Sequence, residues 1–426
     1  MSGPLARYGP GFENLYAGSP LNRMGFLREN YAFLNQAFKH PQTRFIPLLN
    51  QNPFTLNAPA DQVRGKVYND NALIGGVRTG SNPKHPPRHR LGTLSYDQIK
   101  HIAGDPFYAD EQTVIDNWSS TRDRAGVNNA QVVFLGLDES RSGLEFSTKE
   151  NTYKGQAWFA VNVTPMAHSS EKLKQDLEQL VEQQRKDTEA DEGDYRSVRL
   201  GGAALSNSEY AVYAQASMFI DWNNRNKFCG GCGRPLMSIN GGCKLTCPPK
   251  DNGVETGECE TRGRITNLSF PRTDSCTIVA VVSSDGKKLL LGRSSRFPTK
   301  MYSCLAGFLE PGEGLEECVR REVWEEAGVT VGRVVLHSSQ PWPYPANLMI
   351  GCIAEAVEGG EEINTSHDGE LADARWFPME EVIKTLNKEH DEIFIPPKEA
   401  IAHVLIRAAA TGTYLSMEQE QLDAKL

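Results

Sequence analysis

Cysteine is absent from the first 228 residues of this 426-residue chain, and all nine cysteines fall between positions 229 and 352. An odd number of clustered cysteines does not resemble a disulfide framework, and the N-terminus lacks the apolar core of a secretory signal. No apolar run approaches the roughly 18 residues that cross a membrane. We therefore expect an intracellular protein with reduced cysteines and no transmembrane helix.

Positive charge is also in short supply. The chain has 45 Lys and Arg against 54 Asp and Glu, which gives a net charge of −9. This balance argues against a generic nucleic-acid-binding protein, whose surface would carry an excess of positive charge, although it does not exclude a local basic groove. The chain is 39% hydrophobic and 23% charged, as in ordinary globular proteins, and is long enough for two or three domains.

Glycine and glutamate recur at fixed spacings in one segment of the C-terminal half. A loop rich in Gly and Pro leads into helix-forming residues from 315 to 327, and Gly328 is suited to end that helix. On the helix, Glu322, Glu325 and Glu326 stand at i, i+3 and i+4. This spacing places their three carboxylates on one face.

Such crowding of like charge destabilises a bare helix, so a cation is expected beside it. Mg²⁺ and Mn²⁺ are suitable because they accept carboxylate oxygens and share their other positions with water and phosphate. The last carbonyls of a helix also carry partial negative charge, which favours a cation there. The alternative is a solvated, acid-rich surface helix, which is common for an isolated Glu-x-x-Glu-Glu. With the complete loop and both glycines, the sequence favours the metal site.

Residues 307–329 match a known motif at every fixed position. They read Gly, five residues, Glu, seven residues, Arg-Glu, an aliphatic residue, any residue, Glu-Glu, any residue, Gly and an aliphatic residue. This is the pattern of the Nudix box. The chain therefore resembles the Nudix superfamily, whose members hydrolyse nucleoside diphosphates linked to another group.

Four cysteines have the spacing of a structural zinc site. Cys229 and Cys232 form a CxxC knuckle, and Cys247 and Cys259 follow after longer gaps. A Cys₄ zinc ribbon has no open coordination position, so its zinc would stabilise the fold and not catalyse. Cys243 competes for a place in the second pair. The alternatives are a buried pair or a redox pair, and a redox pair would need a thioredoxin-like βαβ setting that the sequence pattern lacks.

Three features narrow the resemblance to one family. Residues 339–345 read Ser-Gln-Pro-Trp-Pro-Tyr-Pro, which resembles the Ser-Gln-Pro-Trp-Pro-Phe-Pro signature of NADH pyrophosphatases. The zinc ribbon ahead of the Nudix box is the second feature. The third is Phe-Pro-Arg-Thr-Asp at 270–274, which is similar to that family's Tyr-Pro-Arg-x-Asp. The chain is thus identified as similar to the NADH pyrophosphatase family, in its peroxisomal eukaryotic type.

This resemblance implies a reaction and a set of residues. The reaction is hydrolysis of the pyrophosphate of NADH, or of NAD⁺, to nicotinamide mononucleotide and AMP, and some members also remove NAD caps from RNA. The resemblance implies catalytic and Mg²⁺- or Mn²⁺-binding roles for Glu322, Glu325, Glu326 and Glu370, with the backbone carbonyl of Ala306 as a further metal ligand. The implied substrate contacts are Ala306, Gly307, Phe308, Phe270, Gln340 and Trp342.

Other positions near the box are also informative. Arg321 and Glu313 are expected to brace the loop against the helix. Phe270 lacks the hydroxyl of the family's Tyr, and Asn347 stands where the signature often ends in Ser. Neither departure touches the metal-binding carboxylates, so we expect catalysis to survive them.

Charge indicates how hydrolysis would proceed. A pyrophosphate carries two negative charges that repel a nucleophile, and bound Mg²⁺ would neutralise them and acidify a bound water. The proton acceptor is left open between Glu325 or Glu326 and Glu370. One rival function is a zinc-ribbon protein that binds NAD-like ligands or RNA ends without hydrolysis, but no box glutamate is missing. Another is a Nudix hydrolase of ADP-ribose, diadenosine polyphosphates or coenzyme A, which usually lacks both ribbon and signature.

The order of expected elements suits an α/β protein with a Nudix α/β/α sandwich preceded by a zinc ribbon and a divergent, mixed α/β N-terminal domain. The predicted domains are 1–205 (N-terminal, Nudix-like), 206–272 (helix plus zinc ribbon), 273–412 (catalytic Nudix) and 413–426 (tail). Helices are expected at 171–186, 208–224, 315–327 and 398–410. Strands are expected at 132–137, 157–163, 277–282, 289–291, 334–336, 348–355 and 373–377.

The two remaining predictions concern the tail and a basic loop. The chain ends Ala424-Lys425-Leu426, a conservative variant of the Ser-Lys-Leu peroxisomal signal. We therefore expect an import receptor as partner and a peroxisomal location, with the cytoplasm as second choice, and the resemblance implies a homodimer. The basic, Pro-rich residues 78–90 are either a phosphate-contacting loop or a solvated insertion, and the second is more common.

Overall fold

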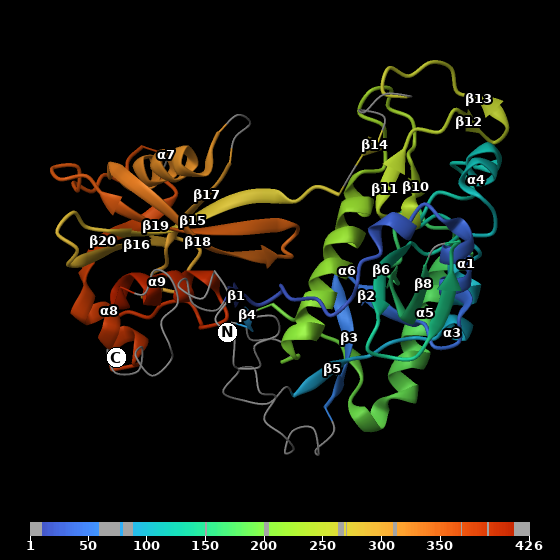
Figure 1. Cartoon of the computed structure of the whole chain (residues 1–426), viewed down its shortest axis with the longest axis horizontal. Helices are drawn as coiled ribbons and strands as arrows, with labels where there is room; N and C mark the ends of the chain where they lie inside the picture. Colours follow the sequence, from blue (N-terminus) through green and yellow to red (C-terminus); the bar gives the residue numbers. More distant parts are fainter. Residues whose placement is uncertain are drawn as a thin grey trace.

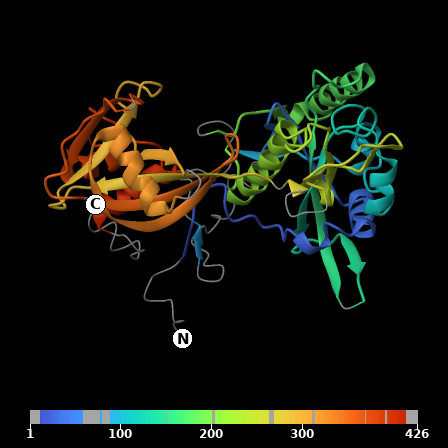
Figure 2. The same ribbon diagram turned by 90° about the horizontal axis from the view of Figure 1, so that it is seen from above.

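The computed structural model describes residues 11–58, 77–79, 88–149, 151–199, 204–262, 268–269, 271–309, 313–367, 369–389 and 392–412. Two α/β bodies lie at opposite ends of the molecule, and a small cysteine-bearing unit projects beside one of them (Figure 1). Seen from above, the two bodies are joined by a narrow connection (Figure 2). Among the described helices, none combines the length and apolar character needed to cross a membrane.

A seven-stranded sheet forms the centre of the N-terminal body. Its strands are β2 (Arg44–Leu49), β3 (Asn52–Asn57), β5 (His89–Leu91), β6 (Val132–Asp138), β7 (Leu144–Ser147), β8 (Thr152–Asn162) and β9 (Asp194–Tyr195). They follow the order β5-β3-β2-β8-β6, with β7 paired to β8 and β9 to β3. The helices are α1 (Tyr31–Lys39), α3 (Tyr96–Ala103), α4 (Glu111–Asn117), α5 (Glu171–Asp187) and α6 (Asn207–Arg225). A separate parallel pair joins β1 (Gly11–Glu13) to β4 (Val77–Thr79).

Successive residues of these strands face opposite sides, and both faces are buried. Phe134 of β6 points into the cluster formed with α1, α3 and α5, whereas its neighbour Val133 points into the cluster formed with α6. α6 contributes Val212, Ala216 and Ile220 to that second cluster. The predicted boundaries group α6 with the ribbon, but its packing makes it a cover of the N-terminal sheet.

Side-chain caps fix the starts of the two long helices. Ser170 accepts a hydrogen bond from the backbone N–H of Leu173 at the start of α5, and Ser206 forms a reciprocal capping box with Glu209 at the start of α6. The apolar stripe expected on α5 is buried. Both helices confirm the sequence prediction.

A six-stranded sheet forms the centre of the C-terminal body. Its strands are β15 (Asp274–Val282), β16 (Lys288–Ser294), β17 (Leu305–Phe308), β18 (Val331–Trp342), β19 (Asn347–Ala356) and β20 (Leu371–Pro378). The order is β18-β19-β15-β16-β20, with β17 paired to β15, and only β15 and β19 run parallel among these described pairs. The helices are α7 (Leu315–Ala327), α8 (Met379–Leu386) and α9 (Ile401–Thr411).

The α/β/α sandwich predicted from the sequence is confirmed in this body. Val279 and Val281 of β15 pack on the face covered by α7, and the alternating residues Ile278, Ala280 and Val282 pack on the face covered by α8 and α9. Figure 1 shows α7 on one side of the sheet and α8 and α9 on the other. The central strand is therefore apolar from Ile278 to Val282, as a strand covered on both faces requires, and Thr277 just before this run is buried with its hydroxyl hydrogen-bonded.

The Trp-Pro run has a definite place in the sheet, and one predicted boundary needs correction. Residues 339–342 end strand β18 and pair with β19. Pro341 lies on the edge strand of this sheet, the position to which proline is confined within sheets. The last helix begins at Ile401 and not at 398, because residues 398–400 form a turn.

The cysteine-bearing unit is small and made of short strands. β10 (Met237–Ile239), β11 (Lys244–Thr246) and β14 (Leu268–Ser269) form one sheet, and β12 (Lys250–Asp251) pairs with β13 (Val254–Glu255). A single turn, η4 (Asn240–Gly242), joins β10 to β11. So little sheet buries little apolar surface, and a unit of this size needs a further stabilising link such as a metal.

A segment near the N-terminus crosses to the edge of the C-terminal sheet. Asn14 Nδ2 donates to Ser338 Oγ (3.2 Å) and to the carbonyl of Ser339 (2.8 Å). The hydroxyls of Tyr16 and Tyr344 lie 3.0 Å apart. The two bodies are therefore tied together at the strand that carries the Trp-Pro run.

Gln340 is the most constrained residue of this junction. It is fully buried, and its Nε2 donates to the carbonyls of Leu15 (3.2 Å) and Glu399 (2.9 Å). Its Oε1 accepts the backbone N–H of Ile401 (2.9 Å), which starts α9. One side chain thus joins the N-terminal segment, the edge strand β18 and the last helix.

Replacing Gln340 with Leu should destabilise the junction. The change leaves two carbonyls and one N–H buried without partners, at about 1–3 kcal/mol each, so we expect the free energy of unfolding to fall by about 3 kcal/mol or more. Chemical unfolding followed by circular dichroism measures this. Gln179→Leu, on the exposed face of α5, is the matched control. Equal unfolding midpoints for the two variants would show that the hydrogen bonds of Gln340 contribute nothing to stability.

Candidate active site

Glycine shapes both ends of α7. The N–H of Gly314 donates to the Glu317 carboxylate (2.7 Å) at the helix start. Gly328, just after the helix, has a left-handed backbone (φ 70°), and a Cβ there would lie 2.8 Å from the Cβ of Asn364. Only glycine fits such a position without strain. The prediction that Gly328 ends the helix is confirmed.

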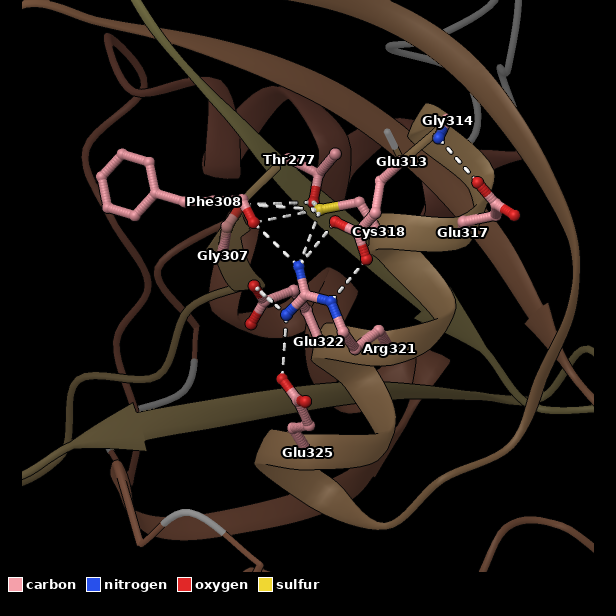
Figure 3. Close-up of polar contacts among 10 residues, drawn as sticks. All are labelled: Thr277, Gly307, Phe308, Glu313, Gly314, Glu317, Cys318, Arg321, Glu322 and Glu325. Atoms are coloured by element: carbon pink, nitrogen blue, oxygen red, sulfur yellow. Dashed lines mark hydrogen bonds and ion pairs between the residues drawn. The ribbon is translucent and has the colours of Figure 1, made fainter. Parts of the chain in front are cut away.

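Arg321 lies at the centre of the site, where its guanidinium links the loop to the helix (Figure 3). Nε and Nη2 donate to the two carboxylate oxygens of Glu313 (2.6 and 2.8 Å). Nη2 also donates to the carbonyl of Phe308 (2.9 Å), while Nη1 donates to Glu322 (2.8 Å) and Glu325 (2.9 Å). The expected bracing by Arg321 and Glu313 is confirmed, and the Glu313 hydrogen bonds raise the pKa of Arg321.

The carboxylate of Glu322 occupies the space where Gly307 has no side chain. A Cβ on Gly307 would lie 1.8 Å from Cδ of Glu322, so any other residue would displace the carboxylate. Burial is the main cause that raises the pKa of Glu322, Arg321 opposes it, and the charges of Glu325 and Glu370 raise it further. Burial and neighbouring negative charges both disfavour the charged form of a carboxylate, and a nearby positive charge favours it.

The other predicted carboxylates differ in how far they are buried. Glu326 is buried (5% exposed), and Glu325 remains half-exposed on the same helix. Glu370 is exposed just before β20, and its charge reaches Glu322. Ala306 lies on β17 beside Gly307, opposite Ile278 of β15. Three of these carboxylates therefore belong to α7, and the charge of the fourth, Glu370, reaches Glu322. Among the described residues, the four are not gathered as closely as the four cysteine sulfurs of the small unit.

The predicted substrate contacts have different surroundings. Phe308 is 54% exposed, and its ring points away from the Arg321 cluster (Figure 3), which leaves an aromatic face open beside the carboxylates. Phe270 lies outside the described residues. Gln340 has no exposed surface because its amide serves the junction. The ring of Trp342 meets Tyr16 and Tyr344 edge-on, so it too packs at the junction.

The sequence interpretation missed a contact behind the carboxylates. Trp324, at a free position of the box, stacks on His367 with ring centroids 4.3 Å apart. The N–H of Asn364 donates to the carbonyl of Ala327 (2.8 Å), so the segment that leads to Glu370 is fastened to the end of α7. No local pattern marks His367, because its partner is more than forty residues away in the chain.

Four cysteines meet in the small unit, as their spacing predicts. The sulfurs of Cys229, Cys232, Cys247 and Cys259 all lie within 4.8 Å of one another and none forms a disulfide. The Thr261 hydroxyl, 3.0 Å from Cys259 Sγ, lowers the pKa of the Cys259 thiol to about 6. Four sulfurs gathered in this way form a metal-binding set with no position left open.

Cys243 does not belong to this cluster. It is buried in the core between the N-terminal sheet and α6, where its Sγ lies 3.7 Å from the carbonyl of Phe134. Burial raises its pKa to about 11, which suits a neutral thiol. The competition between Cys243 and Cys247 left open by the spacing is therefore decided for Cys247.

Two parts of the chain match known domain families. Residues 272–395 match the NUDIX domain, and residues 106–222 match the NADH pyrophosphatase-like rudimentary NUDIX domain. The second match covers β6, β8, α5 and most of α6. It agrees with the packing of α6 on the N-terminal sheet.

The chain also resembles characterised proteins along most of its length. It is 34% identical over 400 residues to the NAD-capped RNA hydrolase of Schizosaccharomyces pombe, a match that covers 93% of this chain and 92% of that protein. Identity is 33% to NAD-capped RNA hydrolase NPY1 of Saccharomyces cerevisiae (89% of each chain) and 33% to NAD-capped RNA hydrolase NUDT12 of Homo sapiens (93% of this chain, 73% of that protein). The chain therefore belongs to the NADH pyrophosphatase-like family of Nudix proteins.

Proposed function

We propose that this protein hydrolyses the pyrophosphate bond of NADH and NAD⁺, releasing nicotinamide mononucleotide (reduced for NADH) and AMP, and that it removes NAD caps from RNA by the same reaction. The observation that carries this function is the complete glutamate cluster on α7, held in place by Arg321. Relatives named NAD-capped RNA hydrolases, similar over about nine-tenths of the chain, support the choice of substrate.

The cation that fits the glutamate cluster is Mg²⁺ or Mn²⁺. All the donors are hard oxygens, which these ions prefer. Glu322, Glu325, Glu326 and Glu370, with the carbonyl of Ala306, would hold it. When bound, the cation supplies positive charge against the pyrophosphate oxygens and acidifies water. The space left by Gly307 lets the Glu322 carboxylate approach the β17 backbone that would share the ion.

The protein's own groups have separate tasks in this reaction. Arg321 fixes Glu322 and Glu325 relative to the loop, so that the acceptor groups stand in place before substrate arrives. The exposed ring of Phe308 offers a stacking face for a nicotinamide or adenine ring. A carboxylate among Glu325, Glu326 and Glu370 takes the proton from the attacking water while the bridging P–O bond breaks.

We assign a structural zinc ion to the four-cysteine cluster. Zn²⁺ favours closed tetrahedral thiolate sites, and such sites contribute directly to folding. Arg262 supports the cluster, because its Nη2 lies 3.7 Å from Cys247 Sγ and its Nε donates to the Cys247 carbonyl. Four thiolates around one divalent ion carry a net negative charge, and the positive charge of Arg262 would offset part of it.

Replacing Glu326 with Gln tests the catalytic assignment. The change keeps side-chain size and removes one charged metal ligand, so turnover of NADH should fall by roughly two orders of magnitude or more, with folding intact. Steady-state kinetics with Mg²⁺ or Mn²⁺ measure this. Glu316→Gln, an exposed charge loss in the first turn of the same helix, is the control and should keep near-normal turnover. Similar turnover in both variants would refute the assignment.

Replacing Arg321 with Lys tests the bracing. Lysine keeps the positive charge but cannot hold Glu313, Phe308 and both helix glutamates at once. We expect kcat for NADH to fall about tenfold or more, with a rise in the Mg²⁺ concentration needed for half-maximal rate. Arg320→Lys is the control, because the Nε of Arg320 makes a single hydrogen bond to the carbonyl of Gly332. Unchanged metal dependence in Arg321→Lys would contradict this role.

Elemental analysis tests the ribbon. Freshly purified protein should contain about one zinc per chain, and mild chelation should not remove it. Cys232→Ser should lose the zinc and much of its soluble yield. Cys243→Ser should keep the zinc, because Cys243 lies in a different core. Zinc-free wild-type protein, or equal zinc loss from both variants, would show that the cluster is assigned wrongly.

A further inference from the structure

A cluster of basic side chains lies in the N-terminal body, where α6 leads into the cysteine-bearing unit (Figure 1). Lys227 and Phe228 follow the end of α6 and come just before Cys229, the first residue of the four-cysteine cluster. The guanidinium of Arg124 lies over the ring of Phe228, 5.9 Å from its centroid. The glutamates on α7 belong to the C-terminal body, so this cluster is separate from the candidate active site.

A contact between two loops places His168 beside Arg124. The hydroxyl of Ser169 donates to the carbonyl of Gly126 (2.6 Å). A Cβ on Gly126 would lie 3.3 Å from Nε2 of His168, so the imidazole packs directly on the loop that carries Arg124. The cluster is therefore assembled from three separate parts of the chain.

Acidic side chains do not offset this charge. Within the described part of the chain, no carboxylate forms an ion pair with Arg124, Lys227 or His168. Asp123, the acidic neighbour of Arg124, accepts hydrogen bonds from Nε and Nη2 of Arg122 (2.7 Å each). Burial and the charge of Arg124 lower the pKa of Lys227, and burial with the charges of Lys227 and Arg124 lowers the pKa of His168. A chain with a net charge of −9 thus keeps one place where positive charges crowd together without an acidic partner.

The cluster is accessible to a ligand. The Phe228 ring is 56% exposed, and Arg124, Lys227 and His168 are each partly exposed. Arginine and lysine are the side chains that bind phosphate groups, and an exposed aromatic ring offers a face on which a base can stack. Single-stranded nucleic acid carries both groups in every nucleotide, whereas an acidic peptide would leave the ring without a partner.

We propose that Arg124, Lys227, His168 and Phe228 form a docking surface for single-stranded RNA, with phosphates against Arg124 and Lys227 and a base stacked on Phe228. The choice of RNA rests on the proposed function, because an NAD-capped RNA has a chain beyond its cap that the protein can hold. The C-terminal body would then act on the cap while the N-terminal body binds the chain.

The charge contribution is tested by fluorescence anisotropy of a labelled, uncapped riboadenylate hexamer on the full-length, zinc-containing protein, with no divalent metal added. Lys227→Gln removes one phosphate contact. We expect it to weaken binding about fivefold or more and to reduce the slope of log K against log salt by about 0.7. Lys186→Gln, an exposed charge loss at the far end of α5, is the matched control and should leave both quantities unchanged.

The stacking contribution is tested with Phe228→Leu. This change removes the ring and keeps an apolar side chain, so binding of the hexamer should weaken about fivefold while the salt slope stays the same. Phe228→Tyr keeps the ring and should bind like the wild type. Because Cys229 is the next residue, zinc content is measured in both variants, and the comparison is made between proteins that retain the metal.

Three results would overturn the proposal. They are wild-type protein that does not bind the hexamer, equal salt slopes in Lys227→Gln and Lys186→Gln, and displacement of the hexamer by a glutamate hexapeptide as readily as by unlabelled RNA. NADH hydrolysis should stay normal in Lys227→Gln and Phe228→Leu, because neither residue lies in the glutamate site. A wild-type protein that bound the hexamer but did not hydrolyse NADH would refute the proposed function and leave the docking surface standing.

Discussion

Arg321 is the group on which the geometry of the glutamate site depends. Its guanidinium is the positive charge that lies among Glu313, Glu322 and Glu325, and its link to the carbonyl of Phe308 sets the loop at a fixed distance from the helix. Without it, Glu322 and Glu325 would repel each other across one turn of α7, and Glu313 would no longer tie the loop to the helix. The arginine balances only part of this charge. Burial is the main cause that raises the pKa of Glu322, and the charges of Glu325 and Glu370 raise it further. A divalent cation bound here would neutralise the remaining negative charge.

The two bodies share one plan, a sheet with helices on both faces, but only one carries the glutamates. The match of residues 106–222 to a rudimentary Nudix domain accounts for this. The described part of the N-terminal body has the layers of a Nudix domain, whereas the Nudix box lies at 307–329, outside this match. It contributes instead the core under α6 and the Tyr16 contacts that join it to the C-terminal body.

Residue spacing predicted those features that depend on interactions between residues close together in the sequence. The helix 315–327, its terminal Gly328 and the CxxC knuckle follow from residues a few positions apart. Spacing could not separate Cys243 from Cys247, because the distinction depends on packing against Phe134, about a hundred residues away. Nor could it show that Gln340 bonds to Leu15, 325 positions distant. Phe270 and the C-terminal tripeptide lie outside the described residues, so their roles, the peroxisomal location and the homodimer stay predictions.

The junction and the glutamate site are connected through the register of one sheet. Trp342 pairs with Asn347, and Asn347 pairs with Asp274 at the start of β15. Two residues further along β15, Cys276 pairs with Phe308 of the loop. A strand register is not continuously adjustable, because a slip of one residue would turn every side chain to the wrong face. The hydrogen bonds of Asn14 and Leu15 to β18 therefore constrain the strand that carries Phe308. The N-terminal body thus helps to position Phe308 beside glutamates that it does not itself contribute.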